Sequence, residues 1–136
     1  MTAIEGKPMA KALGVLAVLA LFFTVPSPAA AQGASLDTLK GRWLRAEGGY
    51  VIEVRGVGPG GKVDAAYFNP RSIHVGKAEA SQVGGDVRLY VELQDVNYPG
   101  SSYTLTYDPK SDRLFGRYFQ AVARETFDVH FVRMKP

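Results

Sequence analysis

The sequence predicts an all-β protein, an eight-stranded antiparallel up-and-down β-barrel preceded by a cleavable signal peptide. Apolar residues alternate with polar ones, most clearly from Val87 to Leu93, and this spacing is typical of a strand with one buried face. The alternation recurs along the chain with no helical pattern between the repeats, so successive strands are expected to pair as antiparallel hairpins. Such strands can close into a barrel that leaves no free edge, and an open two-sheet sandwich is the alternative.

Residues 1–31 are expected to be a signal peptide. Lys7 and Lys11 precede an apolar run at 12–25, and small residues follow that run. The run is shorter than the roughly 20 residues that a membrane span needs, and an uncleaved anchor is the alternative. We therefore expect an exported protein, periplasmic or secreted, with no stable membrane span after cleavage and a single barrel domain at 32–136.

Eight strands are expected, each recognised by apolar residues at alternate positions. A slip of one residue would turn the apolar row towards solvent, so the register of each strand is well specified. The strands are short and carry charges opposite the apolar row, which disfavours an outer-membrane barrel. In chain order the expected strands are 41–46, 50–57, 62–68, 72–79, 87–94, 102–108, 113–120 and 126–134.

The first four strands are justified by their alternation and by their aromatic residues. Trp43 stands near the start of the first strand, and Tyr50 begins the apolar row of the second, where charged residues take the other face. The third strand ends at Tyr67, an inward position. In the fourth, His74 lies opposite the aliphatic row and is expected to point outward.

The last four strands follow the same pattern with one exception. The fifth is the clearest alternating strand, and the sixth sets Tyr103 and Tyr107 against serine and threonine. The seventh is apolar on both faces, because Phe115 and Phe119 lie opposite its inner row; this suggests a contact patch through which the chain could form a homo-oligomer. The eighth alternates phenylalanine and valine with polar residues that include His130.

The connections divide the barrel into two unlike ends. Three are compact turns rich in glycine, proline or aspartate, and in an up-and-down barrel they share one end: 58–61, 83–86 and 108–112. The other four share the opposite end, where carboxylates and amides occur beside arginine or tyrosine: 46–49, 69–71, 95–101 and 121–125. Loops on a rigid scaffold are where recognition usually occurs, so this second end is the predicted site.

The candidate ligand-binding residues are polar or aromatic residues of the decorated connections and of the inner rows. Aspartate and asparagine can hydrogen-bond a ligand, and tyrosine can stack on it. An eight-stranded barrel is wide enough to hold one small ligand. The residues expected at the site are Tyr50, Tyr67, Asn69, Arg71, Asp95, Asn97, Tyr98, Tyr103 and Arg124.

Purely structural explanations compete with this site. Asn97 and the pair Pro99-Gly100 could build a turn unaided, with proline and glycine at the centre of a type II turn. Asn69-Pro70 could likewise start a turn. The inward phenols could fill the lumen and hydrogen-bond to one another, to backbone or to water. The residues alone leave these alternatives open.

Gly41-Arg42-Trp43 followed by a glycine turn and an alternating strand resembles the start of the calycin barrels, the lipocalins and avidins. The stretch from Gly41 to Tyr67 is most similar to avidin, and the resemblance implies a small secreted barrel that binds a small molecule. In lipocalins a basic residue of the last strand packs over the tryptophan. The resemblance therefore implies that Arg133 stacks on Trp43.

The chain also departs from these families. Avidins line their biotin site with several tryptophans, whereas this chain has one, and Arg45 and Gly49 stand where avidins place polar contacts. Biotin binding is therefore not expected. The bacterial secreted metalloprotease inhibitors, another calycin group, are similar in length and export but usually carry a disulfide, and this chain has no cysteine.

Composition and spacing argue against catalysis, metals and nucleic acid. The chain has two histidines, each opposite an aliphatic row, and neither a Gly-x-Ser-x-Gly elbow nor a His-x-x-x-His pair. The 16 basic and 13 acidic residues are interspersed, without the polybasic run that nucleic-acid binding favours. No cofactor, metal or nucleic acid is expected.

We therefore expect an exported non-enzymatic β-barrel that binds a small apolar or amphipathic molecule at its open end. The alternative is a protein-binding module, either inhibitor-like or an interaction protein of the cell envelope, with a filled barrel core. The expected partner is accordingly an unknown small molecule or an envelope or extracellular protein.

Overall fold

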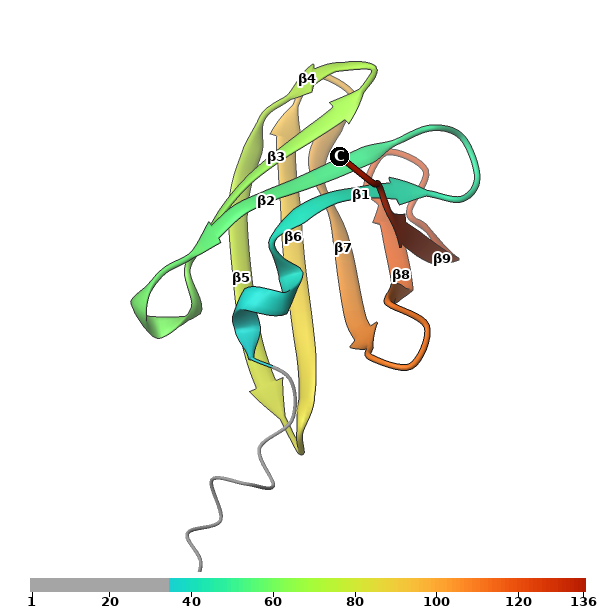
Figure 1. The fold of residues 1–136 in the computed structure, drawn as a ribbon. Coiled ribbons are helices and arrows are strands. Elements are labelled where there is room, and N and C mark those ends of the chain that lie inside the picture. The colour runs from blue at the N-terminus through green and yellow to red at the C-terminus, as the bar shows by residue number, and fades with distance from the viewer. Residues whose placement is uncertain (1–34) are drawn as a thin grey trace, which may run out of the picture.

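The computed structural model describes residues 35–136, so the expected signal peptide at 1–31 lies outside the described residues. The described chain begins with a short 3₁₀ helix, η2 (Leu36–Leu39), and a second, η3 (Pro59–Gly61), lies between two strands. All the strands pair antiparallel (Figure 1). They are β1 (Gly41–Arg45), β2 (Val51–Val57), β3 (Val63–Asn69), β4 (Arg71–Ile73), β5 (Val75–Val83), β6 (Asp86–Asp95), β7 (Tyr98–Asp108), β8 (Arg113–Gln120) and β9 (Glu125–Arg133).

The strands form one nearly closed barrel. Their order in the sheet is β4-β3-β2-β1-β9-β8-β7-β6-β5, so each strand pairs with the next one in the sequence except that β4 and β5 stand at the two ends of the order, and β1 joins β9. In Figure 1, β1, β2 and β3 cross in front of the longer strands β5, β6 and β7. The all-β antiparallel class is confirmed, and the arrangement is a barrel rather than an open sandwich.

The predicted count of eight strands is wrong, because residues 35–136 form nine. The expected strand at 72–79 is divided at His74. Residues on its N-terminal side pair with β3, ending at Ile73 opposite Tyr67, and residues from Val75 onward pair with β6. The His74 backbone bonds towards β6 in both directions: its N–H donates to the Asp95 carboxylate at 2.8 Å, and its C=O accepts from the Gln94 N–H at 3.0 Å. The chain thus changes partner within one extended segment.

The core confirms the alternation. In β6 the side chains of Val87, Leu89, Val91 and Leu93 are all buried, and the residues between them are exposed or partly exposed. The largest fully buried side chains come from strands on opposite sides of the barrel and fill its interior: Trp43, Tyr67, Tyr103 and Phe131. Burial of each such side chain contributes about 1.5–3 kcal/mol.

One end of the barrel is closed by η2 and by Arg133. The Trp43 indole N–H donates to the Leu39 carbonyl at 2.9 Å, which ties η2 to the first strand. The Arg133 guanidinium lies 4.2 Å from the Trp43 ring centroid, so the stacking expected of these two residues is present. Gly41 has φ of +131°, and a Cβ there would lie 2.9 Å from an Arg133 Nη atom. Backbone conformation and space both favour glycine before this tryptophan.

The Arg133 guanidinium is held by a carboxylate, two backbone carbonyls and the Trp43 ring. It makes a bidentate pair with Asp112, at 2.8 and 3.0 Å, and donates to the carbonyls of Thr38 and Lys40. These bonds hold the pKa of the Asp112 carboxyl below its ordinary value, chiefly through the hydrogen bond from Arg133. The compact 108–112 turn, η2 and the last strand are therefore joined at the closed end.

Candidate functional site

Two connections far apart in sequence form one pocket at the opposite, open end. The pocket has a volume of about 500 Å³, and both the β3–β4 turn and the β6–β7 turn contribute to it, near the top of Figure 1. Five predicted site residues line it together with Ser72, Ile73 and Val96: Asn69, Arg71, Asp95, Asn97 and Tyr98. The folded chain therefore gathers the polar residues that the two connections were expected to present.

The β6–β7 turn is shorter than expected. Asp95 and Tyr98 pair directly, so the turn contains only Val96 and Asn97, and Asn97 adopts the left-handed conformation at φ of 68°. The alternative of a type II turn centred on Pro99 and Gly100 is wrong, because both residues belong to β7. Gly100, at φ of 88°, lies within an irregularity of the β6–β7 pairing, between Pro99 opposite Gln94 and Ser102 opposite Glu92.

Hydrogen bonds hold the two turns together. The Asn69 side-chain amide donates to the Tyr98 hydroxyl, and the Asp95 carboxylate accepts from the backbone N–H groups of His74 and Val96. These backbone donors are the main reason that the pKa of the Asp95 carboxyl lies below its ordinary value. The Asp95 carboxylate therefore accepts hydrogen bonds that shape the pocket. Arg71 is the exposed cation of the pocket.

Beneath the pocket the lumen is occupied by tyrosine rings. Tyr67 and Tyr103 are almost completely buried, and their hydroxyl oxygens lie 2.8 Å apart in a hydrogen bond. Tyr103 stacks on Tyr118 at a centroid distance of 4.5 Å, and Tyr67 meets the rings of Tyr50 and Tyr98 at 6.4 and 6.3 Å. The rings pack on one another, so the space for a ligand lies above them at the mouth.

Burial changes the acidity of the two central phenols. It raises the pKa of the Tyr103 hydroxyl to about 12 and raises that of Tyr67 still further. The folded state therefore binds these protons more tightly than the unfolded state, whose phenols titrate near pH 10. Their contribution to the free energy of unfolding is fully present below pH 10 and is lost as the pH rises through the pKa values of the folded state.

Tyr67→Phe is expected to reduce this alkaline loss. The variant should be about 1 kcal/mol less stable at neutral pH, because it lacks the hydrogen bond to Tyr103. From pH 10 upward its free energy of unfolding should fall less steeply than that of the wild type. Urea unfolding at a series of pH values measures both effects. Equal slopes for the two proteins would contradict the assignment.

Arg45 is a site residue that the sequence analysis did not propose. It reaches into the barrel mouth, where its guanidinium carbon lies 5.0 Å from the Tyr50 centroid and 5.4 Å from that of Tyr118. One Nη atom donates to the Tyr103 hydroxyl at 3.4 Å. A signal was present, because Arg45 has the same strand parity as the inward Trp43.

Other predicted residues lie outside the rim pocket. Tyr50 is half-buried beside Arg45, and Arg124 is exposed in the β8–β9 turn with φ of 53°. Phe115 and Phe119 remain 41% and 38% exposed on the outer face of β8, where the His130 ring stacks on Phe115. Within residues 35–136, no three His, Asp or Glu side chains are grouped so that they could hold a metal ion.

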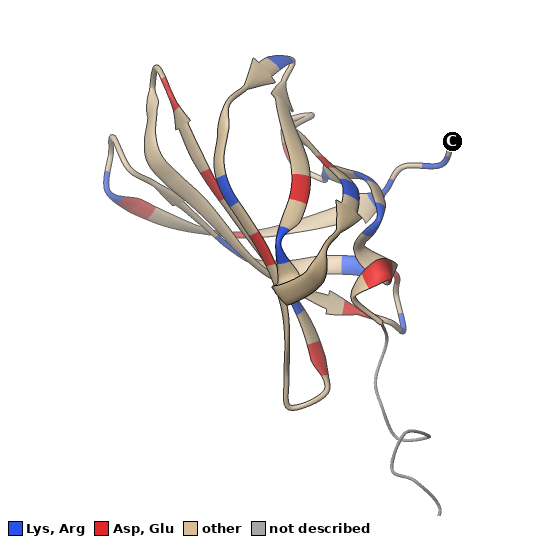
Figure 2. Ribbon diagram, turned by 90° about the vertical axis from the view of Figure 1, so that its left-hand side faces the viewer, with Lys and Arg blue, Asp and Glu red and all other residues tan. Residues whose placement is uncertain are grey.

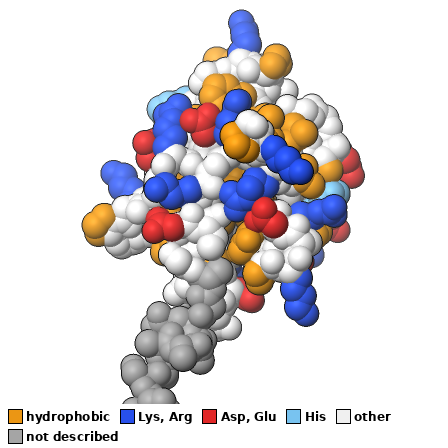
Figure 3. Space-filling model, viewed as in Figure 1, with side chains coloured by type: hydrophobic (Ala, Val, Ile, Leu, Met, Phe, Trp, Pro, Cys, Tyr) orange, Lys and Arg blue, Asp and Glu red, His pale blue; other side chains and the backbone are white. Residues whose placement is uncertain are grey.

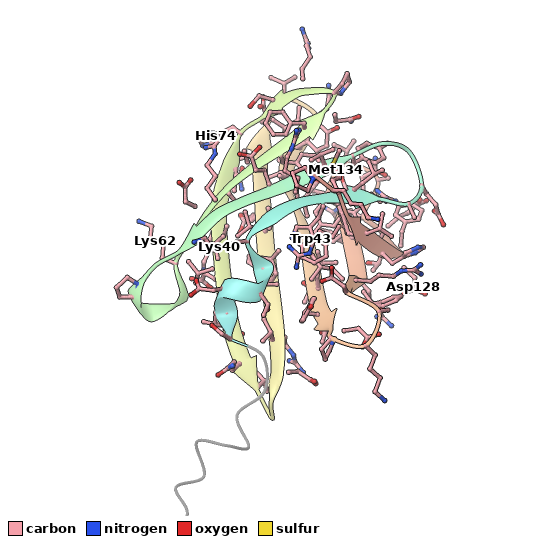
Figure 4. The ribbon with its side chains drawn as sticks, in the orientation of Figure 1. Lys40, Trp43, Lys62, His74, Asp128 and Met134 are labelled. Carbon is pink, nitrogen blue, oxygen red and sulfur yellow. The ribbon has the colours of Figure 1, made fainter. Side chains whose placement is uncertain are left out.

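A second hollow opens in the barrel wall between β3 and β5, with a volume of about 910 Å³. The pairing of β3 with β4 ends where Tyr67 pairs with Ile73. Further along the seam, within residues 35–136, β3 and β5 are joined by a single bridge between Lys62, just before β3, and Glu79. Figure 4 places Lys62 near the η3 turn and His74 towards the other end of the seam, and Figure 2 views the barrel from this side. The lining is rich in small residues: Gly56, Gly58, Gly60, Ala65, Gly76 and Ala78.

The surface is mixed in charge. Figure 3 shows basic side chains interspersed with acidic and hydrophobic ones on the face that carries β1, β2 and β3. Several outward arginines have carboxylate partners, including Arg42 and Arg55 with Glu53, and Arg117 with Asp128. Over the described part of the chain, no helix is long and apolar enough to cross a membrane.

Comparisons with protein-family models, with curated proteins and with solved structures found no match for this chain. The nearly closed antiparallel barrel is compatible with a calycin-like fold.

Proposed function

We propose that this protein is an exported, non-enzymatic β-barrel that binds a small amphipathic molecule at its open end. The observation that carries the proposal is the rim pocket, where residues of two separate turns converge on about 500 Å³ of space. That volume lies within the range of small-molecule sites. The pocket combines an exposed arginine, two side-chain amides and a tyrosine with the apolar side chains of Ile73 and Val96.

We assign the barrel to the calycin type within this proposal. The contact of Arg133 with Trp43, at 4.2 Å, supports the assignment because it is the contact that the lipocalin resemblance implies. Export to the periplasm or the exterior rests on the basic and apolar segments before residue 32.

Native mass spectrometry of the protein from its own exported fraction tests the binding proposal directly. We expect a retained small molecule. Arg71→Gln should weaken its binding by about 10- to 100-fold, because a charged hydrogen bond is lost at the pocket. Arg124→Gln is the matched control, since Arg124 lies in a different turn and does not line the pocket. Recovery of the bare chain, or equal weakening by both variants, would refute the proposal.

A protein-binding module is the second candidate, and the ring-filled lumen favours it because no deep ligand space is then required. The same rim would contact the partner, and the same mass spectra would show a bound polypeptide in place of a small molecule. Self-association through Phe115 and Phe119 belongs to this candidate, and the measured stoichiometry tests it.

A further inference from the structure

Arg45 lies at the mouth of the barrel and Arg133 at its closed end, and the two guanidinium groups have different surroundings. Arg133 has a bidentate carboxylate and two carbonyl acceptors. Within residues 35–136, no carboxylate lies within 4.0 Å of the Arg45 guanidinium nitrogens. Its buried Nε–H has no acceptor at all. Arg45 therefore carries an uncompensated charge at the predicted binding end.

An uncompensated cation of this kind costs stability. A partly buried charge loses hydration, and proteins normally restore that loss with a counter-charge and hydrogen bonds. Ring faces of Tyr50 and Tyr118 provide cation–π attraction, which is weaker than a carboxylate pair. The Nε–H and the neighbouring Nη form the edge with which guanidinium groups bind a carboxylate in a bidentate manner.

We propose that Arg45 is the anion anchor of the open end and that the ligand carries a carboxylate next to a planar apolar body. This inference rests on the proposed function and names its ligand class. The carboxylate takes the free Nε edge, and the planar body stacks on the tyrosine rings from the side of the mouth. The guanidinium fork fits carboxylate and phosphate geometry alike, but its single charge balances one carboxylate and leaves part of the charge of about −1.5 to −2 on a phosphate monoester uncompensated.

Access to this edge requires Tyr50 to move. Of the two rings beside Arg45, Tyr118 is only 7% exposed, whereas Tyr50 is half-buried directly before β2. Tyr50 follows Gly48 and Gly49, which have φ of +100° and +74°. A Cβ on Gly48 would lie 2.5 Å from the Tyr50 ring, so the glycine turn packs directly against the ring that has to turn aside.

Benzoate and benzamide are the matched probes, because they share a shape and differ in charge. Benzoate at tenfold its Kd is expected to raise the Tm of the wild type by about 6 °C, and benzamide much less. Arg45→Met should remove the benzoate response while leaving the Tm without ligand equal or higher, since the variant lacks the uncompensated charge. A purely structural arginine would instead lower the Tm on substitution.

Arg42→Met is the control, because Arg42 lies on the same strand but faces outward towards Glu53; it should keep the benzoate response. If Arg45→Met does not fold, Arg45→Lys retains the charge without the planar edge and should bind benzoate at least about tenfold more weakly. Equal responses to benzoate and benzamide, or an unchanged response in the Arg45 variants, would overturn the anion assignment. The native mass spectra test the proposed function separately, because a retained neutral molecule would support that function and contradict the anchor.

Discussion

Gly116→Ala is expected to destabilise the barrel by about 3 kcal/mol, since overpacking a tight site typically costs 1–3 kcal/mol and occasionally more. A Cβ on Gly116 would lie 1.9 Å from the Thr104 carbonyl oxygen and 2.9 Å from the Leu105 Cα. Both are backbone atoms of β7, which pairs with β8 at this point, so relief requires the two strands to separate. Urea unfolding followed by far-ultraviolet circular dichroism measures the loss.

Gly56→Ala is the matched control for this prediction. Gly56 also lies in a strand, and a Cβ there would have no atom within 4 Å. Alanine restricts the unfolded chain more than glycine does, so this variant should be as stable as the wild type or more stable by up to about 1 kcal/mol. If both variants were equally stable, the close approach of β7 and β8 would not constrain position 116.

Arg133→Met is expected to cost about 3 kcal/mol, because it removes charged hydrogen bonds and a cation–π contact together. The variant loses the bidentate pair with Asp112, the bonds to the Thr38 and Lys40 carbonyls and the stacking on Trp43. Trp43 is the chain's one tryptophan, so urea unfolding followed by its fluorescence reports on this end of the barrel.

The pH dependence of that loss checks its cause. Asp112 has a lowered pKa in the folded protein, so its contribution is present above its ordinary pKa of 3.8 and disappears as the pH falls through the folded value. The difference between the wild type and Arg133→Met should therefore shrink in acid. Arg117→Met is the control: its partner Asp128 is 93% exposed, and such surface pairs contribute about 0–1 kcal/mol. Similar losses for the two arginine variants would contradict the assignment.

The candidate site was predictable in part. The identities of Asn69, Arg71, Asp95, Asn97 and Tyr98 followed from the composition of two connections, and the up-and-down connectivity assigned both to one end. These residues line a single pocket because the two turns lie close together in space, although they are more than 20 residues apart in the sequence. The alternation of apolar residues does not specify that distance. Arg45 shares the inward parity of Trp43, but side-chain alternation predicts an apolar residue at such a position, so a charged residue there does not by itself indicate a site.

The sequence by itself determined the all-β class, most of the inward-facing positions and the two unlike ends, because side-chain alternation and turn chemistry are local properties of the chain. The tertiary structure determined how the strands pair and how their side chains pack. The division at His74, the open seam between β3 and β5 and the filling of the lumen by Tyr67 and Tyr103 all depend on how a twisted sheet closes. The physical reason is that closure brings side chains from opposite walls into one fixed volume, and only that volume determines which rings pack and which guanidinium is left without an acceptor.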